Sequence, residues 1–544
     1  MNAAELLVKC LEEEEVNYIF GVPGEETLSF LEALADSPIR FIITRHEQGA
    51  ALMADVYGRI TGRAGVCLGT LGPGATNLLT GVADAYLDHA PLVAITGQTA
   101  LERVHKESHQ YIDTMDLFHS ITKWQAQIAH PEVVPEVVRK AFKMAETEKP
   151  GPTHIELPEN VAAQDTTGMS LRQTPIQYSR PAQEALQRAA EVITHAKQPM
   201  ILAGNGVIRR GATPELRSFA SRAGIPVVNT FMSKGTMPYT DSLAQLTVGL
   251  QNRDYELCGL ADADVVITVG YDLVEFAPSL WNPKRNKLIV HIDTLPAEVD
   301  QYYQTEVEIV SEIGEALHEL MLMCGPVAGH TGPSLLKDMI MTELGTYADD
   351  MSVPLKPQRI LSDVRRVLKD EDTLISDVGA HKLWIARMFP ATRPNSVIIS
   401  NGFATMGIGV PGGIAARLAE PDRRVVVITG DGGFLMNMQE LETACRLGTA
   451  FVTMVWVDNG YGVIRWKQER SFGRSFGVDF GNPDFSQIAS AFGMPSFTVN
   501  SAEELAPALA RALDLDKPSL IAVPVDYSEN HRLTEALGEV HMVI

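Results

Sequence analysis

The segments VVVITGDGGF (residues 425–434) and FVTMVWVDNGY (residues 451–461) decide the fold of this chain. In each segment a β-branched apolar run ends at an acidic residue, Asp431 in the first and Asp458 in the second, 27 residues later. Apolar residues at helical spacing lie between them, so the spacing corresponds to one strand–helix–strand crossover of a parallel sheet. Both carboxylates are therefore expected side by side at the carboxyl end of that sheet.

Similar apolar runs, each followed by a glycine-containing turn and a helical pattern, recur along the chain. They are residues 65–70, 91–97, 154–158, 200–206, 265–270, 288–293, 373–379, 425–430, 451–457 and 520–525. This alternation predicts an α/β protein whose mostly parallel sheets are flanked by helices. It is interrupted at residues 162–180, and again at 325–332 and 351–357, which flank one amphipathic helix. We therefore expect three domains, at 1–165, 183–325 and 355–528, and a C-terminal tail at 529–544.

Composition excludes several classes of protein. The chain has 544 residues and a net charge of −23, which disfavours phosphate backbones and anionic lipids, so we expect neither a nucleic acid nor a membrane as partner. Its five cysteines are widely spaced, as in a reducing compartment. The acidic run Glu12–Glu15 is unlike a secretion signal, and no run of about 18 apolar residues occurs. We expect a cytoplasmic protein.

The two acidic strand ends also predict a metal site. Two oxygen donors beside glycines, which let a phosphate approach a helix N-terminus, form a site for Mg²⁺ that bridges a diphosphate. A lone Gly-Asp-Gly is more typical of an ordinary acidic turn. The second motif at crossover spacing favours the metal site.

With these motifs the chain resembles the thiamine diphosphate enzymes, whose signature is Gly-Asp-Gly followed by a polar pair roughly one crossover later. The resemblance implies that Asp431, the side chain of Asp458 and the backbone carbonyl of Gly460 bind Mg²⁺. The family more often has Asn at the second ligand position. Asp458 and Asn459 therefore both remain alternatives for that ligand.

The same resemblance points to a catalytic acid in the first domain. The segment TRHEQGAA (residues 44–51) matches the family pattern that carries the carboxylate protonating the aminopyrimidine ring of the cofactor, which implies that role for Glu47. Taken alone, a Glu at a helix start is also typical of a solvated residue that the helix dipole stabilises.

Further cofactor-binding residues follow from the resemblance. The segments 20–24 and 69–77 resemble the turns that pack against the pyrimidine ring, although Leu71 stands where the family usually has Ser or Thr. The segment 377–381 resembles a turn that holds the phosphates. The segment 401–407 resembles the one whose bulky apolar residue supports the bent shape of the cofactor. The implied residues are Pro23, Gly24, Thr70, Gly72, Asn77, Val378, Gly379, Ala380, His381, Thr405, Met406, Gly430, Gly432, Gly433 and Tyr461.

Beyond these motifs, the whole chain resembles the acetolactate synthases, and among them the catabolic, flavin-independent kind. Residues 109–123, 270–293 and 525–530 carry this resemblance. Where the flavin-dependent kind has an Arg-x-Asp-Asp-Arg element, this chain reads YDLVE (residues 271–275), so we expect no functional FAD. The central domain has the look of a dinucleotide fold, with Gly-Asn-Gly at 204–206, but one such turn is weak support.

The resemblance implies decarboxylation of pyruvate and ligation of the two-carbon unit to a second pyruvate, giving 2-acetolactate and CO₂. It places His109 and Gln110 in a loop over the reacting carbon, where the amide can donate to a developing alkoxide. Arg465 and Lys467 either attract the carboxylate of a 2-oxo acid or form a solvated helix start. The natural acceptor is not fixed by the sequence.

Two other functions remain as alternatives. One is a 2-oxo acid decarboxylase of the same architecture, which releases an aldehyde, and the other is a non-catalytic scaffold. The carboxylates Glu47, Asp431 and Asp458 argue against the scaffold. Because Glu47 and Asp431 lie in different predicted domains, which different subunits supply in this family, the resemblance also implies a homodimer or homotetramer.

Overall fold

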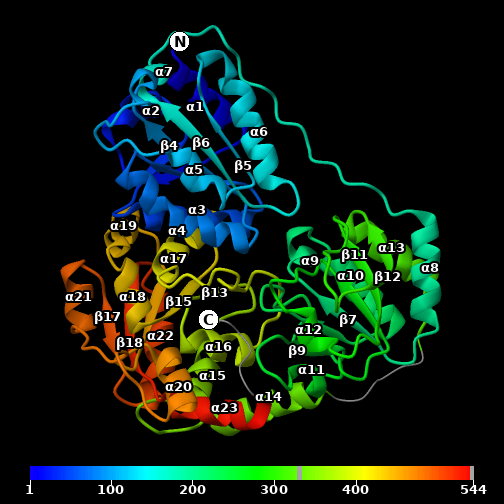
Figure 1. The fold of residues 1–544 in the computed structure, drawn as a ribbon. Helices are drawn as coiled ribbons and strands as arrows, with labels where there is room; N and C mark the ends of the chain where they lie inside the picture. The colour runs from blue at the N-terminus through cyan, green and yellow to red at the C-terminus, as the bar shows by residue number, and fades with distance from the viewer. Residues whose placement is uncertain (328–333, 539–544) are drawn as a thin grey trace. The chain divides into compact units, whose positions relative to one another are not determined.

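The computed structural model describes residues 1–327 and 334–538. Within these ranges the chain has three six-stranded sheets, and all their strand pairs are parallel. Helices flank each sheet (Figure 1). The predicted fold class is confirmed. None of the helices in the described ranges is long and apolar enough to cross a membrane.

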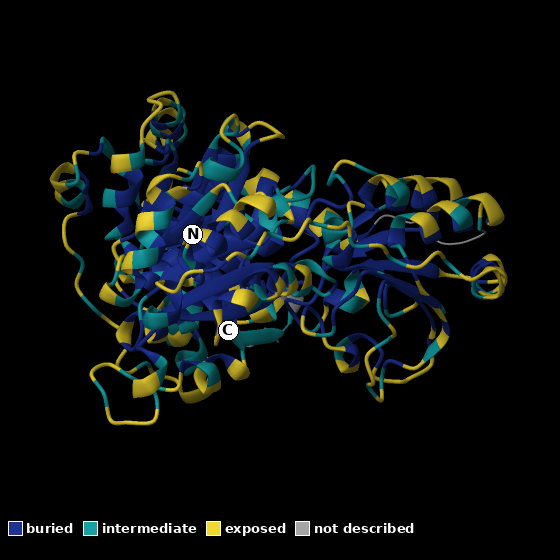
Figure 2. Cartoon of the chain, turned by 90° about the horizontal axis from the view of Figure 1, so that it is seen from above, coloured by how far each residue is buried: buried dark blue, intermediate teal, exposed yellow. Residues whose placement is uncertain are grey.

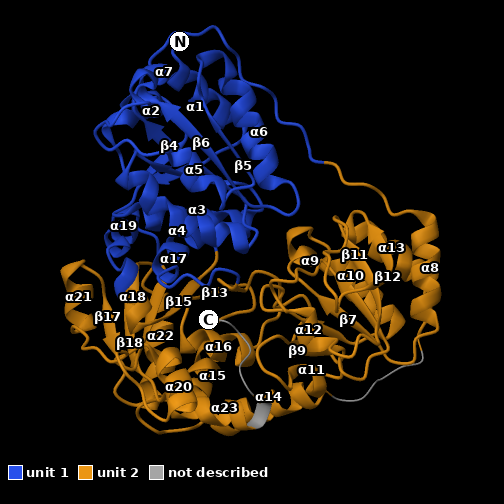
Figure 3. Cartoon of the chain, in the orientation of Figure 1, with its two compact units in different colours: residues 1–176, 402–422, 435–450 blue, residues 177–401, 423–434, 451–544 orange. Residues whose placement is uncertain are grey.

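The chain divides into two compact units (Figure 3). Unit 1 comprises residues 1–176, 402–422 and 435–450, and unit 2 comprises residues 177–401, 423–434 and 451–544. Unit 1 holds the first sheet, and unit 2 holds the central and third sheets. The domain boundaries at 1–165, 183–325 and 355–528 stay predictions. Residues 539–544 of the predicted tail and 328–332 of a predicted linker lie outside the described residues.

The first sheet has the strand order β2-β1-β3-β4-β6-β5. Its strands are β1 Tyr18–Gly21, β2 Arg40–Ile43, β3 Gly65–Gly69, β4 Leu92–Gln98, β5 Trp124–Gln127 and β6 Pro152–Pro158. Its helices are α1 Ala3–Glu13, α2 Leu28–Ala35, α3 Glu47–Thr61, α4 Pro73–Leu87, α5 Thr114–His119, α6 Val134–Glu146 and α7 Glu159–Ala162; α17 Gly409–Ala419 and α19 Glu440–Leu447 belong to the same unit. Helix α3 packs against both α4 and α17.

The central sheet has the order β12-β11-β10-β7-β8-β9, which is the dinucleotide-fold order counted from its first strand. Its strands are β7 Pro199–Ala203, β8 Val227–Asn229, β9 Ala244–Thr247, β10 Val265–Val269, β11 Leu288–Asp293 and β12 Thr305–Val310. Its helices are α8 Gln183–Thr194, α9 Gly206–Arg209, α10 Thr213–Ala223, α11 Asp254–Leu257, α12 Pro278–Trp281 and α13 Ile313–Met323.

The third sheet has the order β14-β13-β15-β16-β18-β17. Its strands are β13 Thr373–Ser376, β14 Val397–Ile399, β15 Val425–Gly430, β16 Val452–Val457, β17 Ser496–Thr498 and β18 Ser519–Pro524. The remaining helices are α14 Leu335–Tyr347, α15 Pro357–Val367, α16 Ala380–Met388, α18 Asp431–Asn437, α20 Gly462–Phe472, α21 Phe485–Ala491, α22 Leu505–Leu513 and α23 Asn530–Leu537.

Most of the inner strands are buried and dark blue in Figure 2, whereas edge strands such as β5 are half-buried. In β15, the β-branched residues 425–428 are all buried, as expected for a parallel strand covered on both faces. One apolar core joins the central and third sheets, because buried side chains from both pack in the same cluster, Trp281 and Trp384 among them. Helix α14 contributes Leu336 and Ile340 to this core.

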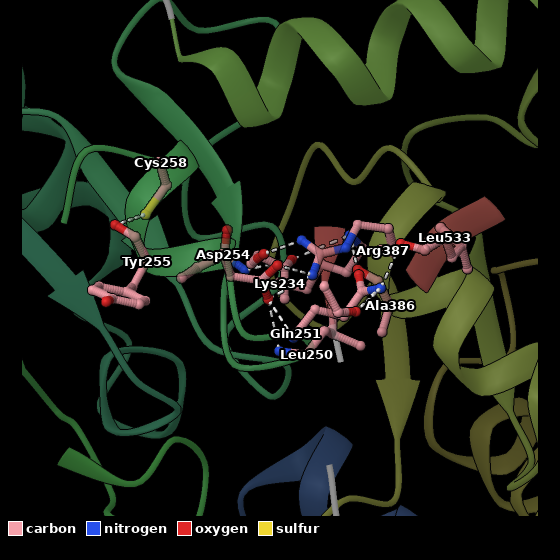
Figure 4. Close-up of polar contacts among 12 residues, drawn as sticks. Lys234, Leu250, Gln251, Asp254, Tyr255, Cys258, Ala386, Arg387 and Leu533 are labelled. Atoms are coloured by element: carbon pink, nitrogen blue, oxygen red, sulfur yellow. Dashed lines mark hydrogen bonds and ion pairs between the residues drawn. The ribbon is translucent and has the colours of Figure 1, made fainter. Parts of the chain in front are cut away.

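A buried ion pair also joins these two sheets (Figure 4). Arg387 of α16 contacts both carboxylate oxygens of Asp254 at 2.5 Å and donates to the carbonyl of Thr247 at 2.9 Å. Lys234 lies beside it and donates to the carbonyl of Ala386 at 3.0 Å. Burial and the nearby guanidinium lower the pKa of Lys234 to about 7. The helix that begins at the predicted phosphate turn is thus tied to the central sheet.

Candidate active site

The first sheet has a topological switch point between β1 and β3, the place where open parallel sheets bind ligands. The turns after these strands touch, because a Cβ atom added to Gly24 would lie 2.3 Å from Cβ of Thr70. The Thr70 hydroxyl donates to Glu26 Oε2 at 2.7 Å. Two predicted cofactor residues are therefore brought together, and Pro23 lies exposed in the same turn.

Glu47 begins α3 and lies beside the second of these turns. His46 caps the helix, since its Nδ1 accepts a hydrogen bond from the N–H of Gln48 at 3.1 Å. Glu47 is 9% exposed, and its Oε2 accepts a hydrogen bond from Asn77 Nδ2 at 3.0 Å. Its Oε1 lies 3.4 Å from the position of a Cβ atom on Gly74. The predicted acid and the predicted Asn77 thus form one contact at a helix N-terminus, which favours negative charge.

Gly72 contacts the loop that carries His109 and Gln110. It has a φ of +51°, and a Cβ atom there would lie 2.6 Å from the carbonyl oxygen of Gln110. Gln110 itself has a φ of +56°, and both loop residues are exposed. The backbone of this loop therefore lies against the turn after β3, while the catalytic roles of its two side chains stay predictions.

Thr405 and Met406 belong to unit 1, whereas the other residues that are predicted to bind the diphosphate half of the cofactor belong to unit 2. The N–H of Thr405 donates to Asp84 Oδ1 at 3.3 Å, and Asn437 Nδ2 donates to the carbonyl of Gly407 at 2.9 Å. Met406 is half-buried between these anchored neighbours. Its backbone position is thus fixed from two sides.

The third sheet has its own switch point, between β13 and β15. The imidazole of His381 lies there against both turns: Cβ atoms added to Gly379 and Gly430 would lie 2.7 Å and 3.4 Å from its Cε1. Burial lowers the pKa of His381 to about 3, so the ring is neutral near pH 7. Among the described residues its Nε2 has no hydrogen-bond partner. Val378 and Ala380, the other predicted residues of the first turn, are buried beside it.

The predicted metal ligands lie together at the ends of the neighbouring strands β15 and β16. Oδ2 of Asp431 accepts hydrogen bonds from the N–H groups of Asp458 at 3.1 Å and Asn459 at 2.7 Å. Burial and the Asp431 charge raise the pKa of Asp458 to about 7. Two mostly buried carboxylates that repel each other are a donor set that fits a divalent cation. Within residues 1–327 and 334–538 no third His, Cys, Asp or Glu completes a metal cluster, and the role of the Gly460 carbonyl stays a prediction.

The glycines of the motif allow close approach. A Cβ atom on Gly432 would lie 3.0 Å from the ring of Tyr461, and one on Gly433 would lie 3.1 Å from Asp377 Oδ1. The predicted residues 378–381, 430–433 and 458–461 lie at or just after the C-terminal ends of β13, β15 and β16, and the first two sets extend into α16 and α18.

Arg465, for which the sequence left two interpretations, lies beside the predicted metal loop. Its guanidinium lies 3.3 Å from Asp458 and 2.7 Å from Asp479, and it donates to the carbonyl of Asn459 at 3.3 Å. A Cβ atom on Gly460 would lie 2.0 Å from it. Arg465 thus offsets negative charge at the predicted metal loop.

Three further residues of these clusters were missed from the sequence. Asn482 donates to Asp431 Oδ2 at 2.7 Å, and Glu26 accepts from Thr70. Tyr527 has a half-buried ring 6.2 Å from that of Trp456, and desolvation with the nearby carboxylates, Asp458 foremost, raises its pKa well above the ordinary value. Of the three, only Tyr527 could have been found from the sequence, because it lies in the stretch 525–530 that resembles the acetolactate synthases.

The switch point of the central sheet lies between β7 and β10, and side chains of the chain itself fill it. The N–H of Asn205 donates to Glu275 Oε1 at 3.1 Å, and that of Gly206 donates to the carbonyl of Gly270 at 2.8 Å. The Thr230 hydroxyl bonds to the other oxygen of Glu275. Burial and the charge of Asp272 raise the pKa of Glu275 to about 8. N–H groups that face a phosphate in a dinucleotide fold are bonded within the chain here.

Comparison with known proteins finds family models that match three parts of the chain. Three family models match: the N-terminal TPP binding domain of thiamine pyrophosphate enzymes at residues 1–117, their central domain at 186–320, and their C-terminal TPP binding domain at 377–523.

Full-length relatives are similar as well. An acetolactate synthase of Bacillus subtilis is 34% identical over 97% of this chain and 94% of its own length. A catabolic acetolactate synthase of Raoultella terrigena is 35% identical over 99% and 97%. A probable acetolactate synthase large subunit of Methanocaldococcus jannaschii is 36% identical over 97% and 93%.

Proposed function

Because this chain belongs to the acetolactate synthase family of thiamine pyrophosphate (thiamine diphosphate) enzymes, which are carboligases and decarboxylases, we propose that it converts two pyruvates to 2-acetolactate and CO₂. The proposed cofactors are thiamine diphosphate and Mg²⁺. The observation that carries the proposal is the similarity to proteins named acetolactate synthase over at least 97% of this chain.

The residues of unit 1 would serve the pyrimidine half of the cofactor. When bound, thiamine diphosphate supplies a carbon nucleophile and a sink for the electrons that decarboxylation releases. Glu47, oriented by Asn77, would exchange a proton with the aminopyrimidine ring. Gly24 and Thr70 would pack on that ring, and the amide of Gln110 would donate to oxygen as negative charge develops there.

The residues of unit 2 would hold the diphosphate and its metal ion. We assign Asp431, Asp458 and the carbonyl of Gly460 to Mg²⁺. The alternative ligand, Asn459, already uses its Oδ1 to accept from Asn482 at 3.0 Å, which favours Asp458. The buried, unbonded Nε2 of His381 supports a polar ligand at that turn.

We propose that the reaction needs no flavin, because the carboxyl group of Glu275 occupies the N–H group that a nucleotide phosphate would require. A homodimer or homotetramer, and a cytoplasmic location, stay predictions. Sedimentation of the purified protein would decide the first.

The proposal is tested by incubating the purified protein with pyruvate, thiamine diphosphate and Mg²⁺, without flavin, and assaying acetolactate and acetaldehyde separately. Acetolactate that disappears in the Glu47→Gln variant supports the proposal. Acetaldehyde alone would assign the chain to the 2-oxo acid decarboxylases instead. No consumption of pyruvate would refute the proposed substrate.

A further inference from the structure

Four charged side chains lie between α3 and α4 that none of the roles above uses. Asp55 and Arg59 belong to α3, Asp84 belongs to α4, and Asp88 is the residue that caps the C-terminal end of α4. Asp55 and Asp84 are 0% exposed, and Asp88 is 3% exposed. Burying an ion is unfavourable unless a partner compensates for the lost water. Asp55 accepts no hydrogen bond from the described residues, so its burial needs a further explanation.

The sequence spacing brings these side chains together in steps of one helical turn. A Cβ atom on Gly81 would lie 2.5 Å from Cβ of Ala51, so the two helices approach closely there. One turn further along each helix come Asp55 and Asp84. The next turn brings Arg59 and Asp88, which form an ion pair at 3.1 Å.

Two of the carboxyl groups hold the segment 402–407, which carries Met406. Asp88 accepts a hydrogen bond from the N–H of Gly402 at 2.5 Å, and Asp84 accepts one from the N–H of Thr405 at 3.3 Å. A Cβ atom on Gly402 would lie 2.6 Å from the carbonyl oxygen of Leu87, so the segment rests directly on the end of α4.

Asp55 differs from Asp84 and Asp88. It is 0% exposed, and across the residues described no N–H or hydroxyl donates to either of its oxygens. A buried carboxylate without a donor is unfavourable, whereas a protonated carboxyl group can itself donate to a neighbouring carboxylate such as that of Asp84. Burial, together with the charge of Asp84, raises the pKa of Asp55 well above its ordinary value.

We propose that Asp55 and Asp84 share one proton, and that this pair is a positioning device which, through Thr405, sets the place of Met406. The role of Met406 rests on the proposed function. The shared proton removes the repulsion between the two carboxyl groups and leaves Asp84 Oδ1 available to the N–H of Thr405. Asp55 is then a positioning residue, and it is not in contact with the reacting atoms.

The proton itself is tested by infrared spectroscopy on the full chain without cofactor or metal. The wild type should have a carbonyl band of a protonated, buried carboxyl group that is absent from the Asp55→Asn variant. Asn keeps a donor toward Asp84, so this variant should fold like the wild type. Identical spectra of the two proteins in this region would overturn the proposal.

The positioning role is tested by titrating thiamine diphosphate with Mg²⁺ into three variants. Asp55→Ala removes the donor and should weaken binding by about tenfold and lower kcat by about 10²-fold. Asp55→Asn should restore both. Leu52→Ala, a truncation at a buried position of the same helix, should lower the melting temperature and leave the dissociation constant unchanged.

Wild-type binding by Asp55→Ala, or equal losses in Asp55→Ala and Asp55→Asn, would overturn the positioning role. A matching loss in Leu52→Ala would do the same, because the effect would then come from helix stability. The infrared band and the dissociation constant do not depend on the product, so they still decide the matter if the chain makes no acetolactate.

Discussion

The first and third sheets have the same topology and carry different chemistry at the same strand ends. Counted from the first strand of each, both have the order 2-1-3-4-6-5. The predicted site residues follow the first four strands in both sheets. The common topology therefore fixes where a ligand can approach, and it leaves the charge at each strand end open.

The difference lies in which strand ends carry carboxylates. In the first sheet Glu47 follows the second strand, and an amide is its hydrogen-bond partner. In the third sheet Asp431 and Asp458 follow the third and fourth strands, which are paired. Acids on adjacent strand ends face each other and suit a cation, whereas an acid bonded to an amide suits proton exchange.

The helices after the first strand of each sheet also differ. Helix α2 buries only Phe30 and Leu34, whereas all nine residues of α16 are buried. Helix α16 is held by the ion pair between Arg387 and Asp254. The turn on the phosphate side of the cofactor is therefore held more firmly than its counterpart in the first sheet.

The sharpest test of the comparison is Glu47→Gln. If this residue exchanges a proton, kcat for pyruvate should fall by about 10²–10⁴-fold. Thiamine diphosphate should bind as before, because Gln keeps an oxygen for Asn77; steady-state kinetics and a binding titration measure the two. Glu25→Gln, an exposed neighbour in the same unit, serves as control. A loss that arises only from weaker cofactor binding would contradict the assignment.

Asp254→Asn should destabilise the region around α16 and the third sheet, and it should leave the first sheet unchanged. Removing one partner of a buried ion pair typically costs about 3–5 kcal/mol, since it leaves the guanidinium uncompensated. Urea unfolding measures the loss, and hydrogen exchange should rise in α16 and not in α2. Asp370→Asn, which removes the exposed partner of Arg365, should cost about 0–1 kcal/mol. Equal costs for the two variants would argue against a firmly held α16.

Asp431→Asn should act on metal affinity, where Glu47→Gln acts on rate. We expect Mg²⁺ to bind at least about 10–100-fold more weakly, and excess Mg²⁺ to restore part of the activity. Titrating Mg²⁺ into protein treated with chelator measures this. An unchanged Mg²⁺ requirement would remove Asp431 from the ligand set.

Arg465→Gln should have the smallest effect of these variants, and it should strengthen Mg²⁺ binding rather than weaken it. This half-buried cation opposes Mg²⁺ through its contact with Asp458, so its loss should strengthen Mg²⁺ binding by about 0.2–1 kcal/mol, less at high salt. The same titration measures it. Weaker binding would mean that Arg465 mainly orders the loop.

The ten apolar runs predicted from the sequence all correspond to inner strands, and most of the strands outside those runs lie at a sheet edge. Runs such as 425–430 are β-branched because both faces are covered. The missed strand β5 reads WQAQ and is half-buried, and β17 has only three residues; both lie at the edge of a sheet. Edge strands keep polar residues, and their pairing depends on neighbours distant in sequence.

The candidate site was predictable at the level of strand ends but not of side-chain partners. Spacing along the chain placed Asp431 and Asp458 together because one crossover separates them. It gave no indication that Arg465 would bond to Asp458, or that Asn482 would reach Asp431. These contacts depend on the path of the chain after β16, which no local pattern records.

The carboxyl group of Glu275, bonded to Asn205 in the central sheet, has a consequence for how this protein is made. A side chain that is part of the polypeptide is present whenever the chain folds, and it loses no translational entropy when it fills its site. A free ligand stabilises a protein only in proportion to its supply. On the proposed flavin-independent function, the central sheet should therefore reach its full stability in cells starved of riboflavin, and added FAD should leave the melting temperature of the protein unchanged.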